Sequence, residues 1–184
     1  MSTHATNLLY RLTMSAVSAV LGTAVLASAA TFRTTTDTMQ VNGDEVKTST
    51  QVRIDDALRT IAGSRQVGRN EVSWRVPGLG EARLVIPESR AARVACPADR
   101  LCFWDNTDYG GDLRHYPRCP RKGTDYYLEG FRDRAESWQN NTSWTAWVYN
   151  YRTPIRQRLW TMNTGFYSPD VGGGNRNKAD YFRC

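Results

Sequence analysis

The sequence predicts an all-β protein, a small β-sandwich domain preceded by a short helix and a β-hairpin. Between Cys96 and Cys184, seven or eight short strand-like segments alternate with turn residues, and no long segment there has helical periodicity. These 89 residues contain 17 of the chain's 20 aromatic residues and all four of its cysteines. A domain of this size has a limited core, so we expect disulfides to stabilise it.

The composition of the chain argues against several classes of protein. Hydrophobic residues make up 40% and charged residues 23% of its 184 residues, which excludes wholesale disorder and a multi-span membrane protein. Histidine occurs only at His4 and His115, and no Gly-x-Ser-x-Gly, His-Glu-x-x-His or phosphate-loop motif is present. We therefore expect a protein that is not an enzyme, uses no cofactor and acts by binding.

Residues 1–29 have the pattern of a secretory signal peptide. Arg11 precedes an apolar run over 12–27, and Ala27-Ser28-Ala29 forms an A-x-A cleavage site before Ala30. The run is short for a spanning helix, although an uncleaved anchor is the alternative. We expect a secreted, extracellular protein that makes no membrane contact after cleavage.

Two further segments precede the β-sandwich. Residues 30–50 include seven threonines and show no periodicity, which is typical of a flexible leader, a linker or a propeptide. Residues 51–95 are expected to form an accessory region. Its apolar spacing predicts a helix over 52–62, and two alternating runs at 72–76 and 82–86 flank a Pro-Gly turn and predict a hairpin.

The even number of cysteines in an exported chain indicates disulfides. We pair Cys96 with Cys102 and Cys119 with Cys184, although four cysteines allow two other connectivities. A structural zinc site is less compatible with the sequence, since five residues separate Cys96 from Cys102 and only one histidine lies beyond the signal peptide.

A short motif in the first part of the cysteine-rich region carries a family resemblance. Trp104 is followed by Tyr109 and Gly111, a spacing that resembles the Greek-key signature of βγ-crystallins, in which the glycine permits a positive φ where the chain folds back. Downstream, Asp133, Ser137 and the adjoining Trp138 resemble the acidic and serine element of that fold. The resemblance implies a βγ-crystallin-like sandwich of two Greek keys over 96–184.

The same region is similar to secreted bacterial proteins of the peptidase inhibitor family typified by the Streptomyces metalloproteinase inhibitor. The similarity includes the Cys-Pro opening, which four further residues separate from a second cysteine, the Leu-Cys-Phe-Trp and Tyr-x-Gly segments, and the Ser-Trp-x-Asn-Asn segment. It implies a monomeric inhibitor that places a rigid, disulfide-braced loop in the cleft of an extracellular protease. Rigid loops bind tightly because they lose little entropy on docking.

One departure from the family leaves the reactive bond undefined. The archetype holds its inhibitory loop with a close cysteine pair in the second Greek key, and this chain has no such pair there. The best local candidate is a proline-stiffened, cysteine-anchored loop made of Arg118, Cys119, Pro120, Arg121 and Lys122. The alternative is that these residues form only a basic surface turn tied down by a disulfide.

Other binding functions remain open. βγ-Crystallin motifs can ligate calcium, and Asp133 with Ser137 would be a weak site, because Arg132 puts a positive charge where the cation would lie. Exposed tryptophan and tyrosine suit a carbohydrate-binding or antimicrobial module without inhibitory activity. Export and the 18 acidic residues argue against a nucleic-acid partner, despite a net charge of +6.

Overall fold

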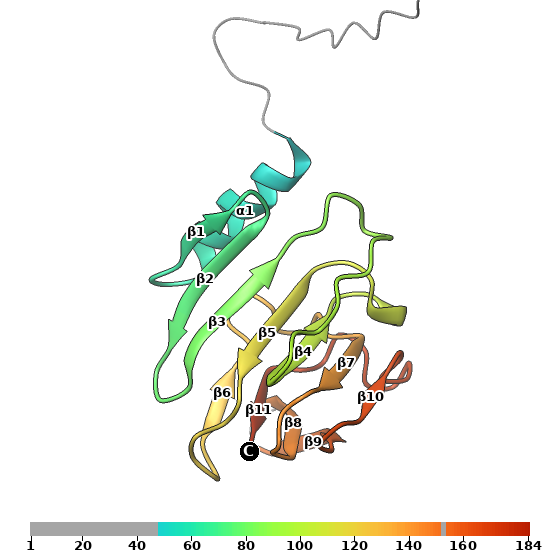
Figure 1. Ribbon diagram of the computed structural model, residues 1–184. Coiled ribbons are helices and arrows are strands. Elements are labelled where there is room, and N and C mark those ends of the chain that lie inside the picture. The colour runs from blue at the N-terminus through green and yellow to red at the C-terminus, as the bar shows by residue number, and fades with distance from the viewer. Residues whose placement is uncertain (1–47, 152–153) are drawn as a thin grey trace, which may run out of the picture. The chain divides into compact units, whose positions relative to one another are not determined.

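The computed structural model of the protein describes residues 48–151 and 154–184 (Figure 1). One helix precedes a series of short strands, with bounds α1 (Ser49–Thr60), β1 (Arg65–Gly68), β2 (Glu71–Val76), β3 (Gly80–Val85), β4 (Arg100–Trp104), η1 (Thr107–Tyr109), β5 (Leu113–Pro117), β6 (Asp125–Tyr127), β7 (Ser137–Asn140), β8 (Ala146–Tyr151), β9 (Arg156–Met162), β10 (Tyr167–Ser168) and β11 (Tyr181–Arg183). The expected signal peptide and most of the threonine-rich leader lie outside the described residues and stay predictions. Within the described ranges, no helix is long and apolar enough to cross a membrane.

The strands form two antiparallel sheets. The first has seven strands in the order β1-β2-β3-β5-β4-β7-β10, and the second has four in the order β6-β11-β8-β9. Strands β4 to β7 make one Greek key and strands β8 to β11 the other. Each Greek key places its third strand in the opposite sheet, so that β6 pairs with β11 while β10 pairs with β7. The predicted all-β sandwich of two Greek keys is thereby confirmed.

Aromatic side chains from both sheets meet in the core. Phe182 of β11 lies with its ring centroid 5.9 Å from Phe103 of β4 and 5.1 Å from Tyr116 of β5. All three side chains are fully buried. Successive side chains of a strand point to opposite faces of its sheet, so Phe182 points into the core while Tyr181 and Arg183 point to the outer face of the second sheet.

Helix α1 begins earlier than the apolar spacing predicts. Thr48 caps it by accepting a hydrogen bond from the backbone N–H of Gln51 at 3.2 Å, so the polar residues before position 52 are helical as well. The helix ends at Thr60 because Ile61 is extended. Its buried side chains are Ile54, which belongs to the predicted apolar spacing, and Ala57, which does not.

The β2–β3 hairpin is joined to the first sheet. Arg83 to Val85 of β3 pair with His115 to Leu113 of β5, so the hairpin continues the sheet beyond the Greek key. Trp74 of β2 packs edge-on against Tyr116, with ring centroids 6.0 Å apart. Strand β1 is an additional outer strand that the sequence did not predict, because its mostly exposed residues do not alternate.

Buried arginines connect this N-terminal part to the sandwich. The guanidinium carbon of Arg114 lies 5.1 Å from the ring centroid of Trp74 and 5.2 Å from that of Phe131. Its nitrogens donate to the carbonyl oxygens of Glu129 at 2.9 Å and Gly130 at 3.0 Å. Burial lowers the pKa of Arg114 to about 10, so it stays charged at neutral pH.

A second charged cluster lies beside helix α1. Arg53 of the helix forms a salt bridge with Asp112, whose carboxylate also accepts from Arg134 at 3.2 Å. Arg134 donates to Asp105 at 2.5 Å as well. Asp105 and Asp112 are almost fully buried, so loss of one cation would leave a desolvated carboxylate less well compensated.

Candidate functional site: a basic loop beside a tryptophan-lined cavity

The loop expected to be inhibitory connects the two sheets of the sandwich. It joins β5 of the first sheet to β6 of the second, and Arg118, Pro120, Arg121 and Lys122 are exposed. We call residues 118–122 the basic loop. Only Cys119 within it is buried, with 4% of its surface exposed.

The basic loop lies beside the C-terminal end of β11 (Figure 1), and two links fasten it there. Cys119 forms a disulfide with Cys184, and the backbone N–H of Gly123 donates to the terminal carboxylate of Cys184 at 2.5 Å. Just beyond the loop, Asp125 of β6 pairs with Arg183 of β11. The loop therefore has a fixed base and an exposed basic apex.

The charges of the basic loop are not neutralised locally. Across the described residues, Arg118, Arg121 and Lys122 form none of the salt bridges found in the molecule. Arg183 and Arg156, by contrast, both pair with Asp125. An acidic surface would complement the loop.

Beside the loop lies a cavity of about 420 Å³. Half-buried Trp144 and Trp147 form its apolar walls. Lys122, Arg183 and Cys184 line the same cavity, as do Thr145 and Thr164. We call this space the tryptophan cavity. Lys122 belongs to both the loop and the cavity, so the two form one continuous surface.

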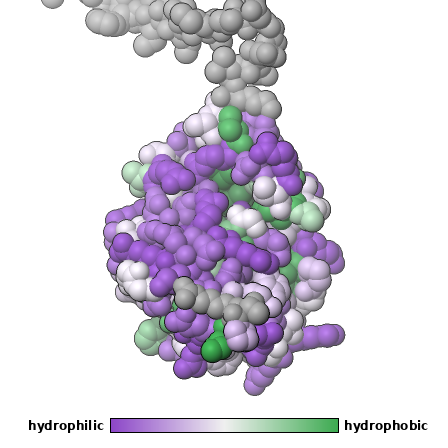
Figure 2. Space-filling view, turned by 180° about the vertical axis from the view of Figure 1, so that it is seen from behind, coloured by the Kyte–Doolittle hydropathy of each residue, from purple (hydrophilic) through white to green (hydrophobic). Residues whose placement is uncertain are grey.

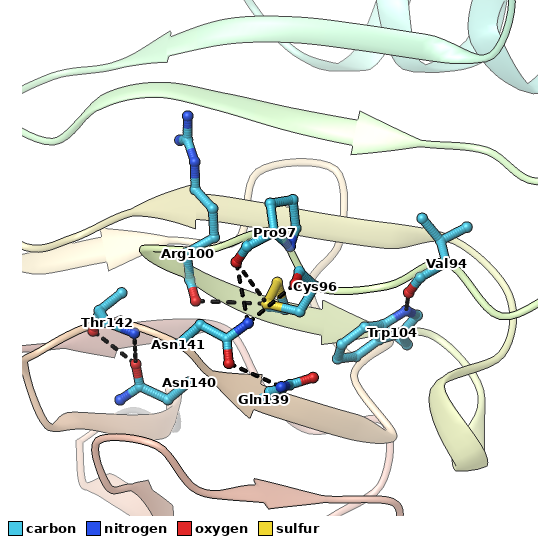
Figure 3. The surroundings of a disulfide bond; sticks show 10 residues. Val94, Cys96, Pro97, Arg100, Trp104, Gln139, Asn140, Asn141 and Thr142 are labelled. Carbon is cyan, nitrogen blue, oxygen red and sulfur yellow. Dashed lines mark hydrogen bonds between the residues drawn. A yellow bond between two sulfur atoms is a disulfide. The ribbon is translucent and has the colours of Figure 1, made fainter.

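The other disulfide joins Cys96 to Cys102 at the start of the first Greek key (Figure 3). The amide of Asn141 donates to the carbonyl oxygens of Cys96 at 3.0 Å and Pro97 at 3.1 Å, and so holds the disulfide-bonded turn against the end of β7. Of the three connectivities that the sequence allowed, the structure has the preferred one. Every cysteine is paired.

The fold motif residues make the turn between β4 and β5. The ring of Tyr109 packs against that of Trp104 with centroids 5.2 Å apart, and Gly111 has a φ of 76°. A Cβ at Gly111 would overlap Oδ1 of Asp105, which accepts the backbone N–H of Asp112 at 2.6 Å. The motif thus has a local structural role in the fold-back.

Ser137 also contributes to this turn. Its hydroxyl donates to the carbonyl oxygen of Asn106 at 2.7 Å and accepts from the backbone N–H of Tyr109 at 3.2 Å. The neighbouring Trp138 is mostly buried in the core. Ser137 is fully buried and its hydroxyl is engaged by the fold-back, which does not fit a calcium ligand.

Asp133, the other weak calcium candidate, lies on an exposed turn with a φ of 56°. Its backbone N–H donates to the carbonyl oxygen of Ala179 at 2.9 Å. Over the part of the chain that the structure describes, no group of three or more acidic, histidine or cysteine residues could hold a metal ion. We derive no calcium-dependent step from these residues.

Comparison with known proteins bears on the region that contains the basic loop. Residues 89–157 match the model of peptidase inhibitor family I36. The resemblance expected from the sequence is thereby confirmed for this segment, which includes the first Greek key and strand β8. The matched family consists of peptidase inhibitors, so the match points to a protein that is not an enzyme.

Two solved structures are similar to part of the chain. A βγ-crystallin domain from Clostridium beijerinckii is 20% identical, with a TM-score of 0.36, and the match covers 46% of this chain and 94% of that one. A double mutant of clostrillin in complex with nickel is 21% identical, with a TM-score of 0.35 and the same coverage of 46% and 94%. A search of curated proteins finds no match.

The tryptophan cavity was not anticipated from the sequence. Trp144 lies just before β8 and Trp147 within it, and most aromatics of a small β domain belong to its core. Only the folded chain brings them to Lys122, Thr164 and Arg183. The half exposure of two tryptophans depends on this arrangement, and no local motif encodes it.

Proposed function

We propose that the protein is a secreted peptidase inhibitor that presents the basic loop, Arg118 to Lys122, to the cleft of an extracellular peptidase. The observation that carries the proposal is a loop whose base is fastened to β11 and whose basic apex is exposed. The family match over residues 89–157, which includes the loop, supports the same function. The two disulfides of the protein are compatible with an oxidising, extracellular location.

The mechanism that we propose requires binding without covalent chemistry by the inhibitor. A loop held at Cys119 and Gly123 keeps its conformation in the free protein, so docking costs little conformational entropy. Arg118, Arg121 and Lys122 would then meet an acidic subsite of the peptidase, because like charges would repel the loop. We therefore expect a target whose cleft has a negative rim.

Inhibition assays test this function directly. The purified protein is titrated against thermolysin-type, subtilisin-type and trypsin-type peptidases, and we expect inhibition of at least one class. The double variant Arg121→Glu/Lys122→Glu should raise the inhibition constant by about tenfold or more, because it places carboxylates against an acidic rim. The measurement is the inhibition constant at two ionic strengths.

Arg69→Glu provides a matched control, since Arg69 is exposed in the β1–β2 turn, outside the basic loop and the cavity. It should leave the inhibition constant within about twofold of the wild-type value, as is usual for surface positions outside an interface. The proposal would be wrong if no peptidase class is inhibited, or if the control and the loop variant behave alike.

A further inference from the structure

The walls of the tryptophan cavity are held in place by buried hydrogen bonds. The amide of Asn140, which is fully buried, donates to the carbonyl oxygens of Trp144 at 2.7 Å and Met162 at 2.8 Å. The backbone N–H of Trp144 donates to the hydroxyl of Thr142 at 3.3 Å. Trp147 lies on β8, directly opposite Arg183 of β11. The cavity is therefore preformed in the free protein.

The charged side chains that line the cavity are both basic, and Cys184 adds the carboxylate at the end of the chain to the lining. No aspartate or glutamate lines the cavity, whereas Lys122 and Arg183 do. The ammonium nitrogen of Lys122 lies 5.8 Å from the ring centroid of Trp144. Asp125 offsets the charge of Arg183, with a distance of 2.6 Å between Nε and Oδ1, but Lys122 and the neighbouring Arg121 have no such partner among the described residues. The cavity thus combines apolar walls with a cationic rim.

We propose that the tryptophan cavity binds an aromatic or large aliphatic side chain from an acidic segment of the peptidase that the protein inhibits. The side chain would pack between Trp144 and Trp147, and carboxylates beside it would meet Lys122 and the basic loop. This inference rests on the proposed function and assigns a second contact to the same partner. A volume of about 420 Å³ lies within the usual range of ligand pockets, which is about 300–1,000 Å³.

A broad apolar contact is not an alternative on the face shown in Figure 2, which is mainly hydrophilic with small, separate hydrophobic areas. A nucleic acid fits the site less well than a peptide does. Tyr149 and Tyr181, on the outer face of the adjoining sheet, stack on one another with centroids 5.1 Å apart, and Arg183 and Arg156 lie over their rings. Their faces are therefore not free for stacked bases.

A labelled acidic peptide with one aromatic residue, Asp-Glu-Asp-Phe-Glu-Asp, is the probe for this site. Fluorescence anisotropy with the whole protein should give saturable binding that weakens as salt is added. A peptide with glycine in place of the phenylalanine should bind about tenfold more weakly, as should the variants Trp144→Ala and Lys122→Glu. The matched control for the tryptophan is Tyr151→Ala, since Tyr151 is 51% exposed on β8 and does not line the cavity.

Several outcomes would overturn the proposal. The first is that the peptide does not bind at ~1 mM, which corresponds to very weak affinity. The second is that Trp144→Ala and Tyr151→Ala bind the peptide equally well. The third is that a thymidine oligonucleotide or an oligogalacturonate binds more tightly than the peptide. Inhibition assays separate this result from the proposed function. If the wild type inhibits a peptidase and Trp144→Ala inhibits it equally well, the cavity proposal is wrong and the inhibitory function stands. If the peptide binds as expected and no peptidase is inhibited, the cavity is a site for acidic peptides, and both its assignment to a peptidase and the inhibitory function are wrong.

Discussion

His115 is a buried histidine that remains uncharged in the folded protein. Its side chain lies on β5, opposite Cys102 of β4 and Arg83 of β3. Burial lowers its pKa to about 4, and the positive charge of Arg100 contributes in the same direction. The opposing influence of Glu71 is smaller.

Stability should therefore fall in acid because of His115. The unfolded chain takes up a proton near the ordinary histidine pKa of about 6.5, whereas the folded protein does so only near 4. The free energy of unfolding is unaffected by this group above pH 6.5 and decreases by about 3 kcal/mol between there and pH 4. Urea denaturation of wild type and His115→Gln across this range should show a shallower loss for the variant, and parallel curves would contradict the assignment.

Gly111 occupies a position where both the backbone and the available space favour glycine. Its φ of 76° is strained for other residues, and a Cβ would overlap the Asp105 carboxylate that organises the fold-back. Gly111→Ala should therefore lower the free energy of unfolding by about 2–4 kcal/mol. Gly172→Ala is the control, because Gly172 has a φ of 82° with nothing within 4 Å, and it should cost only about 1 kcal/mol. Equal losses in urea denaturation would show that steric overlap is unimportant.

At the level of elements, the N-terminal helix and hairpin behave as part of the sandwich. The β3–β5 pairing, the packing of Trp74 on Tyr116 and the Arg53–Asp112 salt bridge all cross between the N-terminal elements and the Greek keys. No disulfide crosses this boundary, since Cys96 and Cys102 both lie beyond it. We propose that residues 48–95 remain in the active protein.

Cleavage of the connection between β3 and β4 tests this proposal. A recognition sequence for a specific protease is inserted between the exposed residues Ala91 and Ala92. After cleavage, the two fragments should elute together in native size-exclusion chromatography and separate in urea, because only non-covalent contacts join them. Elution of a free N-terminal fragment in native buffer would identify this segment as detachable.

Across the whole molecule, the sequence predicts best those structural features that depend on contacts between residues close together in the chain. Trp104, Tyr109 and Gly111 indicate the fold-back because their contacts are made within one turn. Strand β1 was missed because its residues do not alternate, and β10 because two residues give no pattern. The cavity was missed for a different reason, since Lys122, Trp144, Thr164 and Arg183 come from four separate parts of the chain.

Each Greek key contributes its third strand to the opposite sheet, and this arrangement would hold the basic loop in place after a peptidase cuts it. If a bond between Pro120 and Gly123 were hydrolysed, the upstream end would stay tied to Cys184 through Cys119. The downstream end would stay in β6, which pairs with the same β11 strand that ends beside Cys184. Both new termini would thus be retained side by side, so product release would be slow and resynthesis of the bond favoured. A nicked molecule would still occupy the enzyme.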